Sequence, residues 1–181
     1  ISFFPDVLLE MPAREITSAR IAILASGSGP NAEALMEHFA SGTGAQVGEV
    51  VWVCTNRKKA GVRQRAATLG VQESHIPKDD MLSGALLSEL QAPRIDWIAL
   101  AGFLLKVPSE VCQAFEGRMV NIHPALLPKH GGAGMYGMNV HRAVKDAGDD
   151  VSGMTIHFVN EAYDEGDIVF QGEVDLAEGD G

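Results

Sequence analysis

Basic residues and cysteines are scarce in this 181-residue sequence. It has 14 lysines and arginines against 24 aspartates and glutamates, and its formal net charge is −10. Because nucleic-acid surfaces need clustered positive charge, we expect no nucleic-acid partner. The two cysteines, Cys54 and Cys112, are far apart and form no CxxC pair. This predicts buried thiols in a reducing compartment, and we expect the cytoplasm.

Long apolar runs and metal-binding patterns are also missing. No stretch is long and apolar enough to cross a membrane, so we expect no membrane partner. A metal site built from His123 with His130, His141 and His157 is one interpretation of the histidines. Their spacings match neither HxxxH nor HExxH, and we therefore predict no metal.

Length and composition indicate one domain with a substantial core. Hydrophobic residues make up 46% of the chain and charged residues 21%, as is usual for a globular protein. We assign residues 20–181 to this domain and residues 1–19 to an N-terminal extension. The opening ISFFPDVLLEMP lacks the basic leader of a signal peptide, and Met11 is a candidate natural start.

Apolar runs of strand length alternate with helical patterns along the chain. We predict strands at 20–26, 49–55, 71–77, 95–102, 119–123, 154–160 and 168–174, and helices at 32–40, 56–69, 78–90, 108–115 and 139–147. Such alternation predicts an α/β fold with a doubly wound, mainly parallel sheet and helices on both faces. The last two strands flank an acidic turn, which suggests a hairpin and a mixed sheet.

A glycine loop, Gly27-Ser28-Gly29-Pro30-Asn31, joins the first predicted strand to the first helix. Free N–H groups at a helix N-terminus favour a phosphate or another anion. The loop is neither GxGxxG nor a Walker A sequence. A tight turn that merely needs small residues explains it equally well.

Asn121 and His123 stand two residues apart on a predicted strand that Pro124 ends. Strand spacing sends both side chains to the same face. The amide can donate to an oxygen that gains negative charge, and the imidazole can donate to it or move a proton. The pair therefore suits carbonyl chemistry. The alternative is that both residues only end the strand and hold a loop.

The acidic turn YDEGD supplies two candidate carboxylates, Asp164 and Asp167. Either one, placed near His123, would hold its tautomer and favour the imidazolium. Sequence spacing does not choose between them, and ordinary turn chemistry explains both residues. The glycine loop, the FLLKVP segment and the Asn121/His123 pair all follow predicted strands, so we expect them at one edge of the sheet.

Four segments, IAILASGSGPN, LAGFLLKVP, NIHPALLPK and HFVNEAYDEGDIVFQ, occur in this order. With them, the chain from Arg20 to Val174 resembles the phosphoribosylglycinamide formyltransferases, folate-dependent enzymes of purine synthesis. The resemblance implies a Rossmann-like formyltransferase fold and transfer of formyl from the co-substrate 10-formyltetrahydrofolate to the amine of glycinamide ribonucleotide. It implies small-molecule substrates and no metal, and we expect a monomer or a homodimer.

The resemblance also assigns residues by position. It implies a catalytic set of Asn121, His123 and Asp164, and so selects Asp164 over Asp167. The implied ribonucleotide phosphate site is Ser28, Gly29, Pro30 and Asn31. The implied folate site is Leu104, Leu105, Lys106, Val107, Asn121, Asn160, Glu161 and Asp164.

The chain departs from the family pattern in several places. The segment MLSGALLSEL carries no arginine, and Leu105 stands where the family frequently has one, so we expect folate contacts to shift to Lys106. The glycine-rich loop after Lys129 is longer than usual and is expected to be mobile. The family normally adds a further strand and a C-terminal helix beyond the point where this chain ends. We therefore expect that segment to be missing here.

Other functions remain as alternatives. A methionyl-tRNA formyltransferase would need an RNA partner that the charge disfavours, and it usually lacks this phosphate-type loop. A formyltetrahydrofolate deformylase usually carries an N-terminal regulatory domain, for which about twenty residues before the first strand are too few. A non-catalytic nucleotide-binding module on the same fold is the alternative from a different class.

Overall fold

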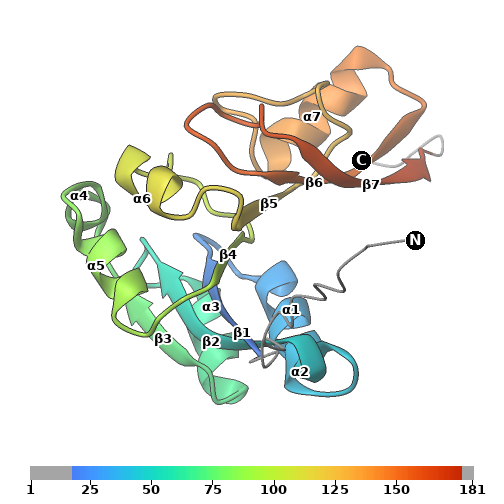
Figure 1. The fold of residues 1–181 in the computed structure, drawn as a ribbon. Helices are drawn as coiled ribbons and strands as arrows, with labels where there is room; N and C mark the ends of the chain where they lie inside the picture. Colours follow the sequence, from blue (N-terminus) through green and yellow to red (C-terminus); the bar gives the residue numbers. More distant parts are fainter. Residues whose placement is uncertain (1–17, 177–181) are drawn as a thin grey trace, which may run out of the picture.

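The computed structural model describes residues 18–176, and these residues form one seven-stranded sheet flanked by helices (Figure 1). The strands are β1 Ala19–Leu24, β2 Gly48–Thr55, β3 Gln72–His75, β4 Trp97–Leu100, β5 Met119–His123, β6 Val151–Phe158 and β7 Ile168–Asp175. The helices are α1 Pro30–Ala40, α2 Gly44–Val47, α3 Gly61–Thr68, α4 Lys78–Leu82, α5 Ala85–Gln91, α6 Ser109–Ala114 and α7 Met138–Ala147.

The sheet order is β3-β2-β1-β4-β5-β6-β7. The first five strands in this order pair in parallel, whereas β6 pairs antiparallel with both β5 and β7. The predicted doubly wound, mainly parallel and mixed sheet is therefore confirmed, including the hairpin formed by the last two strands. The predicted extension 1–19 lies almost wholly outside the described residues, as does the end of the chain.

Successive residues of β1 bury opposite faces of the sheet, which explains its continuous apolar run. Ile21 and Ile23 pack with Met36 of α1 and Val62 of α3. On the other face, Ala22 and Leu24 join the cluster that reaches α4, α5 and α6. Helices thus cover both faces around β1, as predicted, and this double core holds the ends of the central strands in place.

Two predicted helices differ from the observed ones. The helix expected at 56–69 begins only at Gly61, because a turn comes first, in which the Ala60 N–H donates to the Arg57 carbonyl. The helix expected at 78–90 is divided into α4 and α5 at Gly84, whose φ is 96°. A residue in this left-handed conformation interrupts an α-helix. The short helix α2 was not predicted.

Helix ends and strand ends explain the smaller differences. Gly137, not Asn139, precedes α7, and the Asn139 amide donates instead to the Gly134 carbonyl. Strand β6 begins at Val151, three residues before its predicted start, because it pairs with β7 over this whole length. Strand β5 ends at His123, directly before Pro124, as predicted. Within residues 18–176, none of the helices is long and apolar enough to span a bilayer.

The chain changes direction across the sheet between β1 and β4. From β1 it proceeds outward to β2 and β3, and then returns to β4 on the other side of β1. The loops after β1 and β4 consequently diverge and leave a crevice at the carboxyl ends of the strands. Ligands of doubly wound sheets bind in this kind of crevice.

Candidate active site

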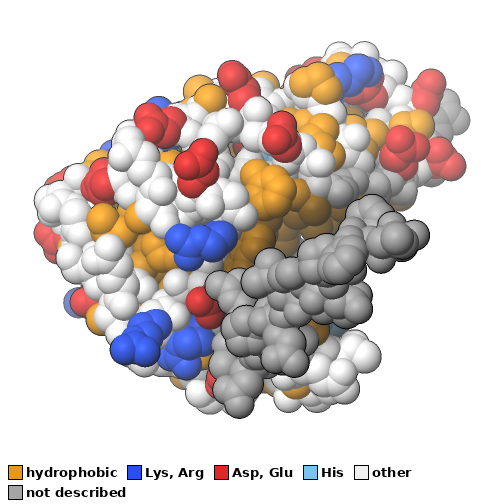
Figure 2. Space-filling view, viewed as in Figure 1, with side chains coloured by type: hydrophobic (Ala, Val, Ile, Leu, Met, Phe, Trp, Pro, Cys, Tyr) orange, Lys and Arg blue, Asp and Glu red, His pale blue; other side chains and the backbone are white. Residues whose placement is uncertain are grey.

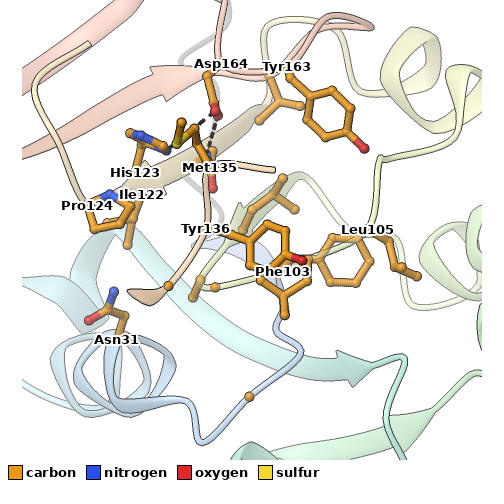
Figure 3. A pocket seen from close by; sticks show the side chains of 18 of the residues that line it. Asn31, Phe103, Leu105, Ile122, His123, Pro124, Met135, Tyr136, Tyr163 and Asp164 are labelled. Atoms are coloured by element: carbon orange, nitrogen blue, oxygen red, sulfur yellow. Dashed lines mark hydrogen bonds and ion pairs between the residues drawn. The ribbon is translucent and has the colours of Figure 1, made fainter. Parts of the chain in front are cut away.

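A cavity of about 400 Å³ opens at this crevice. Loops after β1, β4 and β5, the glycine-rich loop before α7 and the loop between β6 and β7 all contribute to it. Figure 2 shows hydrophobic side chains gathered in a hollow at the centre of the molecular face. In Figure 3, Asn31 lies on one side of the cavity, Leu105 and Tyr163 lie on the other, and His123 and Asp164 face one another above. Segments distant in sequence thus share one binding space, as the sheet topology predicts.

Asn121, His123 and Asp164 meet at one wall of the cavity. Asn121 Nδ2 lies 3.4 Å from Asp164 Oδ1, and His123 Nδ1 lies 3.6 Å from Asp164 Oδ2. One carboxylate therefore contacts both strand residues, which share a face as their spacing predicts. Asp167 is exposed farther along the same turn. The geometry thus places Asp164, rather than Asp167, beside the histidine.

Each ring nitrogen of His123 faces an acceptor. Nε2 lies 2.9 Å from the His130 carbonyl oxygen, and Nδ1 faces the Asp164 carboxylate. The side chain is almost fully buried, with 3% of its surface exposed. The Nε2 contact requires an N–H donor at that nitrogen, whereas the separation between Nδ1 and the carboxylate is longer than a normal hydrogen bond.

His157 is a member of this wall that the sequence analysis considered only as a metal ligand. Its Nδ1 lies 2.8 Å from the Phe158 carbonyl oxygen, so Nδ1 carries the hydrogen. Its Nε2 lies 3.0 Å from Asn121 Nδ2 and 3.5 Å from Asp164 Oδ1. Nε2 therefore faces both the Asn121 amide and the Asp164 carboxylate. His157 thereby fixes the orientation of that amide.

Asp164 is held in its charged form although it is mostly buried. Burial alone would raise the pKa of its carboxyl group. Hydrogen bonding with His157 and a 2.9 Å bond from the Gly132 N–H outweigh this effect, with the charge of His123 adding to them, and the net pKa is lowered. A carboxylate therefore stands beside the two imidazoles at neutral pH.

The glycine loop forms the opposite wall, and its conformation depends on Gly29. Gly29 has φ 76°, and a Cβ there would lie 2.5 Å from Val62 Cγ2. Pro30 occupies the first turn of α1, as predicted, where its missing N–H costs nothing. The Ser28 carbonyl accepts a 2.8 Å bond from Arg65 Nε of α3. Helix α3 thus contacts the loop through Val62 and Arg65. The N-terminus of the eleven-residue α1 faces the cavity.

The predicted folate segment Leu104–Val107 lines a third side of the cavity, together with Phe103. The Leu104 N–H donates a 2.9 Å bond to Ser26 Oγ, which ties this segment to the end of β1. Lys106 Nζ lies 5.8 Å from the centre of the Tyr163 ring, a cation–π distance. Lysine and tyrosine therefore approach one another from two separate loops at the cavity.

Two predicted folate residues, Asn160 and Glu161, do not line the cavity. Asn160 Oδ1 accepts from the Ala162 N–H, and Glu161 accepts from Gln113 of α6. They shape the loop that carries Tyr163 and Asp164 into the cavity. As for metals, residues 18–176 bring together no group of three His, Cys, Asp or Glu side chains suited to an ion.

The comparisons with known proteins identify the family of this chain. The formyl transferase family model matches residues 19–181. The chain is 38% identical over 178 residues to the chloroplastic phosphoribosylglycinamide formyltransferase of Arabidopsis thaliana, covering 94% of this chain and 60% of that protein. It is 41% identical over 157 residues to the enzyme of the same name from Vigna unguiculata, covering 84% and 50%.

A solved structure is similar over most of its length. Glycinamide ribonucleotide transformylase 1 from Symbiobacterium toebii superposes with a TM-score of 0.82 and 34% identity, covering 91% of this chain and 76% of that one. The chain spans only 50–60% of the length of the two plant relatives. The family match nevertheless extends over nearly the whole chain, and the chain belongs to the formyl transferase family.

Proposed function

We propose that this protein transfers a formyl group from 10-formyltetrahydrofolate to the amine of glycinamide ribonucleotide, a step of purine synthesis. The observation that carries the proposal is the meeting of an amide, an imidazole and a carboxylate within 3.6 Å at one cavity wall, opposite a helix N-terminus. These are the groups that acyl transfer needs, and the helix terminus suits a phosphate. The relatives' names identify the same reaction.

The ribonucleotide phosphate would bind at Ser28–Asn31. Pro30 has no N–H, so the donors are the backbone groups on either side of it and the amide of Asn31. The positive end of the α1 dipole adds attraction for the anion. Anchoring the phosphate there directs the rest of the ribonucleotide toward Asn121 and His123 across the cavity.

The formyl donor would enter between Leu104–Val107 and the loop of Tyr163 and Asp164. Phe103, Leu105 and Val107 supply apolar surface for the flat pterin ring, while backbone groups supply hydrogen bonds. Lys106 offers a positive charge to the anionic end of the folate. Substrates held on two sides of one cavity would bring amine and formyl carbon together, which replaces a bimolecular encounter.

In the reaction the amine nitrogen bonds to the formyl carbon, and the formyl oxygen becomes an oxyanion. Asn121 Nδ2 and His123 would donate to this oxygen. Their contacts to Asp164, at 3.4 and 3.6 Å, are long for hydrogen bonds, so the oxygen can replace them at little cost. The negative charge of Asp164 would stabilise positive charge on the His123 ring as the oxyanion forms.

Proton transfer completes the exchange. The amine must lose one proton, and the folate nitrogen must gain one as its bond to the formyl carbon breaks. Asp164 would position a water molecule that accepts the amine proton and passes one to the leaving nitrogen. The proposal thus assigns the chemistry to Asn121, His123 and Asp164 together with this water molecule. The cytoplasmic location and the oligomeric state stay predictions.

Turnover of the full-length protein with 10-formyltetrahydrofolate tests this proposal, with glycinamide ribonucleotide compared against water as the acceptor. We expect formylated ribonucleotide to appear only when the amine is present. Formate released without the amine would instead identify a deformylase. No consumption of the donor under either condition would contradict formyl transfer and favour a binding module.

A further inference from the structure

Outside the lining of the substrate cavity, His130 and Asp149 form a side-chain pair. His130 Nε2 lies 2.7 Å from Asp149 Oδ2, and Lys129 Nζ lies 2.9 Å from the other oxygen of the same carboxylate. The two paired side chains are largely shielded, with 14% and 18% of their surfaces exposed. Hydrogen bonds from His130 first, and then from Lys129, hold the pKa of Asp149 below its usual value.

The backbone that follows His130 touches two members of the wall. The His130 carbonyl lies 2.9 Å from His123 Nε2, and the Gly132 N–H donates a 2.9 Å bond to Asp164 Oδ2. A segment of only three residues therefore contacts both the imidazole and the carboxylate. Any shift of this segment would alter both contacts at once.

The contact to His123 determines where the ring carries its hydrogen. A carbonyl oxygen only accepts hydrogen bonds, so Nε2 of His123 must be protonated to make this bond. The other nitrogen, Nδ1, is then directed at Asp164. The carbonyl thus fixes a hydrogen on Nε2 and the rotation of the ring, a role that second partners commonly have for functional histidines.

The backbone alone is poorly suited to hold this carbonyl. His130 has φ 54°, a conformation that few residues other than glycine adopt, and Gly131 and Gly132 follow it directly. Glycines add freedom to the chain, and strained conformations persist only where the surroundings enforce them. The side chain of His130 is in turn bonded to Asp149, which lies in the turn between α7 and β6.

We propose that the His130–Asp149 pair positions His123 for catalysis by holding the His130 carbonyl against Nε2 of the His123 ring. His130 acts through its backbone on another residue and is therefore a positioning residue. Its kinetic consequence rests on the proposed formyl transfer, whereas its effect on the His123 ring does not. The other charged groups around the pair are Lys129, Asp150 of the same turn and Glu173 of β7, which border a second cavity beside it.

Asp149→Ala removes the carboxylate that binds His130, and His130→Phe removes the imidazole that this carboxylate binds. Neither substitution changes the identity of a residue that lines the substrate cavity. Asp149→Asn keeps an oxygen that can accept from His130 and serves as the conservative rescue. Lys129→Met removes the other partner of the same carboxylate and is the matched control, because the His130 bond remains.

We expect Asp149→Ala and His130→Phe to lower kcat roughly 10- to 100-fold, since small misplacements of a catalytic group have effects of this size. KM for both substrates should stay within about twofold, because neither substrate contacts the pair. Asp149→Asn should recover most of the loss, and Lys129→Met should resemble the wild type. A purely structural role would instead lower the melting temperature and leave the kinetic constants of the folded fraction unchanged.

Nitrogen-15 NMR of the histidine rings, assigned with His123→Ala, gives a readout that needs no activity. In the wild type we expect an Nε2–H signal of His123 that exchanges slowly with water. In Asp149→Ala this signal should shift and exchange faster, while Lys129→Met leaves it unchanged. An unchanged His123 signal in folded Asp149→Ala would overturn the proposal, whatever happens to turnover. If the wild type showed no turnover, only the proposed function would be refuted. The NMR signals of the His123 ring would still test whether the His130–Asp149 pair positions that ring.

Discussion

The two walls of the cavity are built in different ways. The glycine-loop wall presents backbone N–H groups, and its shape depends on one left-handed glycine packed against Val62. The opposite wall presents side chains from β5, β6 and the loop before β7, and these side chains are linked by contacts of 3.0–3.6 Å. Backbone conformation therefore governs one wall, and ionisation and hydrogen bonding govern the other.

This difference separates binding from chemistry. A wall of backbone groups tolerates most side-chain changes but not a change that alters φ. A wall of linked side chains keeps its shape when one member is shortened, yet it loses the charge or the donor that the reaction needs. Substitutions on the first wall should therefore affect ribonucleotide binding and stability, and substitutions on the second wall should affect turnover and pH dependence.

The largest effect is expected for His123→Ala, which removes the charged donor from the side-chain wall. Loss of such a group should lower kcat by roughly 10²–10⁴-fold. Folate binding should remain largely intact, because the folate segment Leu104–Val107 is elsewhere in the cavity. Steady-state kinetics and folate titration check this prediction. If binding and turnover fell by equal factors, the separation of the two walls would be wrong.

Gly29→Ala tests the backbone wall, with Gly27→Ala as its matched control. The new Cβ at Gly29 meets Val62 in a left-handed backbone, whereas a Cβ at Gly27 meets nothing within 4 Å. We expect Gly29→Ala to lower the free energy of unfolding by roughly 2–4 kcal/mol and to weaken ribonucleotide binding. Urea denaturation measures the first effect and calorimetry the second. Equal stabilities of the two variants would show that Gly29 is not the residue that sets the loop.

Asp164→Asn should reveal a pH-dependent contribution to stability. The folded-state pKa of Asp164 lies below its ordinary value of 3.8, so the carboxylate stabilises the fold fully above that pH. The contribution is lost as the pH falls through the lowered pKa. The variant should therefore be less stable at pH 7 by about 1–2 kcal/mol, and the gap should narrow as the pH falls below 3.8.

Urea denaturation of both proteins between pH 7 and pH 3 measures this gap. Asp167→Asn removes an exposed carboxylate of the same turn and is the control. A gap for Asp164→Asn that widened toward low pH would mean that burial, and not hydrogen bonding, controls this carboxyl group.

The smallest effect is expected for Asn31→Ala, in the first turn of α1. Loss of one hydrogen bond to the phosphate should weaken ribonucleotide binding by about 0.5–1.5 kcal/mol, or roughly 2- to 10-fold. Folate affinity should not change. Glu37→Ala, on an exposed position farther along the same helix, is the control. An unchanged ribonucleotide Kd would remove the phosphate-loop assignment from the account.

The fold and the edge of the sheet that holds the cavity could be predicted from local patterns. The apolar residues of β1, the glycines after it and the spacing of Asn121 and His123 can each be recognised within a window of about ten residues. Gly84 divides the helix expected at 78–90, and a glycine inside a helical segment is a signal that can be recognised in the sequence. The choice of Asp164 over Asp167 needed the resemblance, since turn spacing alone left both open.

The positions of His157 and His130 depend on strand register and on contacts between residues distant in sequence. Local sequence patterns do not encode either of these. His157 stands beside Asn121 because β5 and β6 pair antiparallel with these residues opposite one another. His130 meets Asp149 only because the turn after α7 returns the chain to it. A sequence shows which groups can take part in chemistry, but the pairing of strands decides which of them meet.

The most direct test of the two-wall account is a crystal structure with glycinamide ribonucleotide and an unreactive analogue of the formyl donor. The account predicts the phosphate at the N-terminus of α1 beside Asn31. It predicts the carbonyl oxygen of the analogue within about 2.7–3.1 Å of Asn121 Nδ2 and a ring nitrogen of His123. A phosphate bound away from α1, or a carbonyl oxygen turned away from Asn121 and His123, would contradict it.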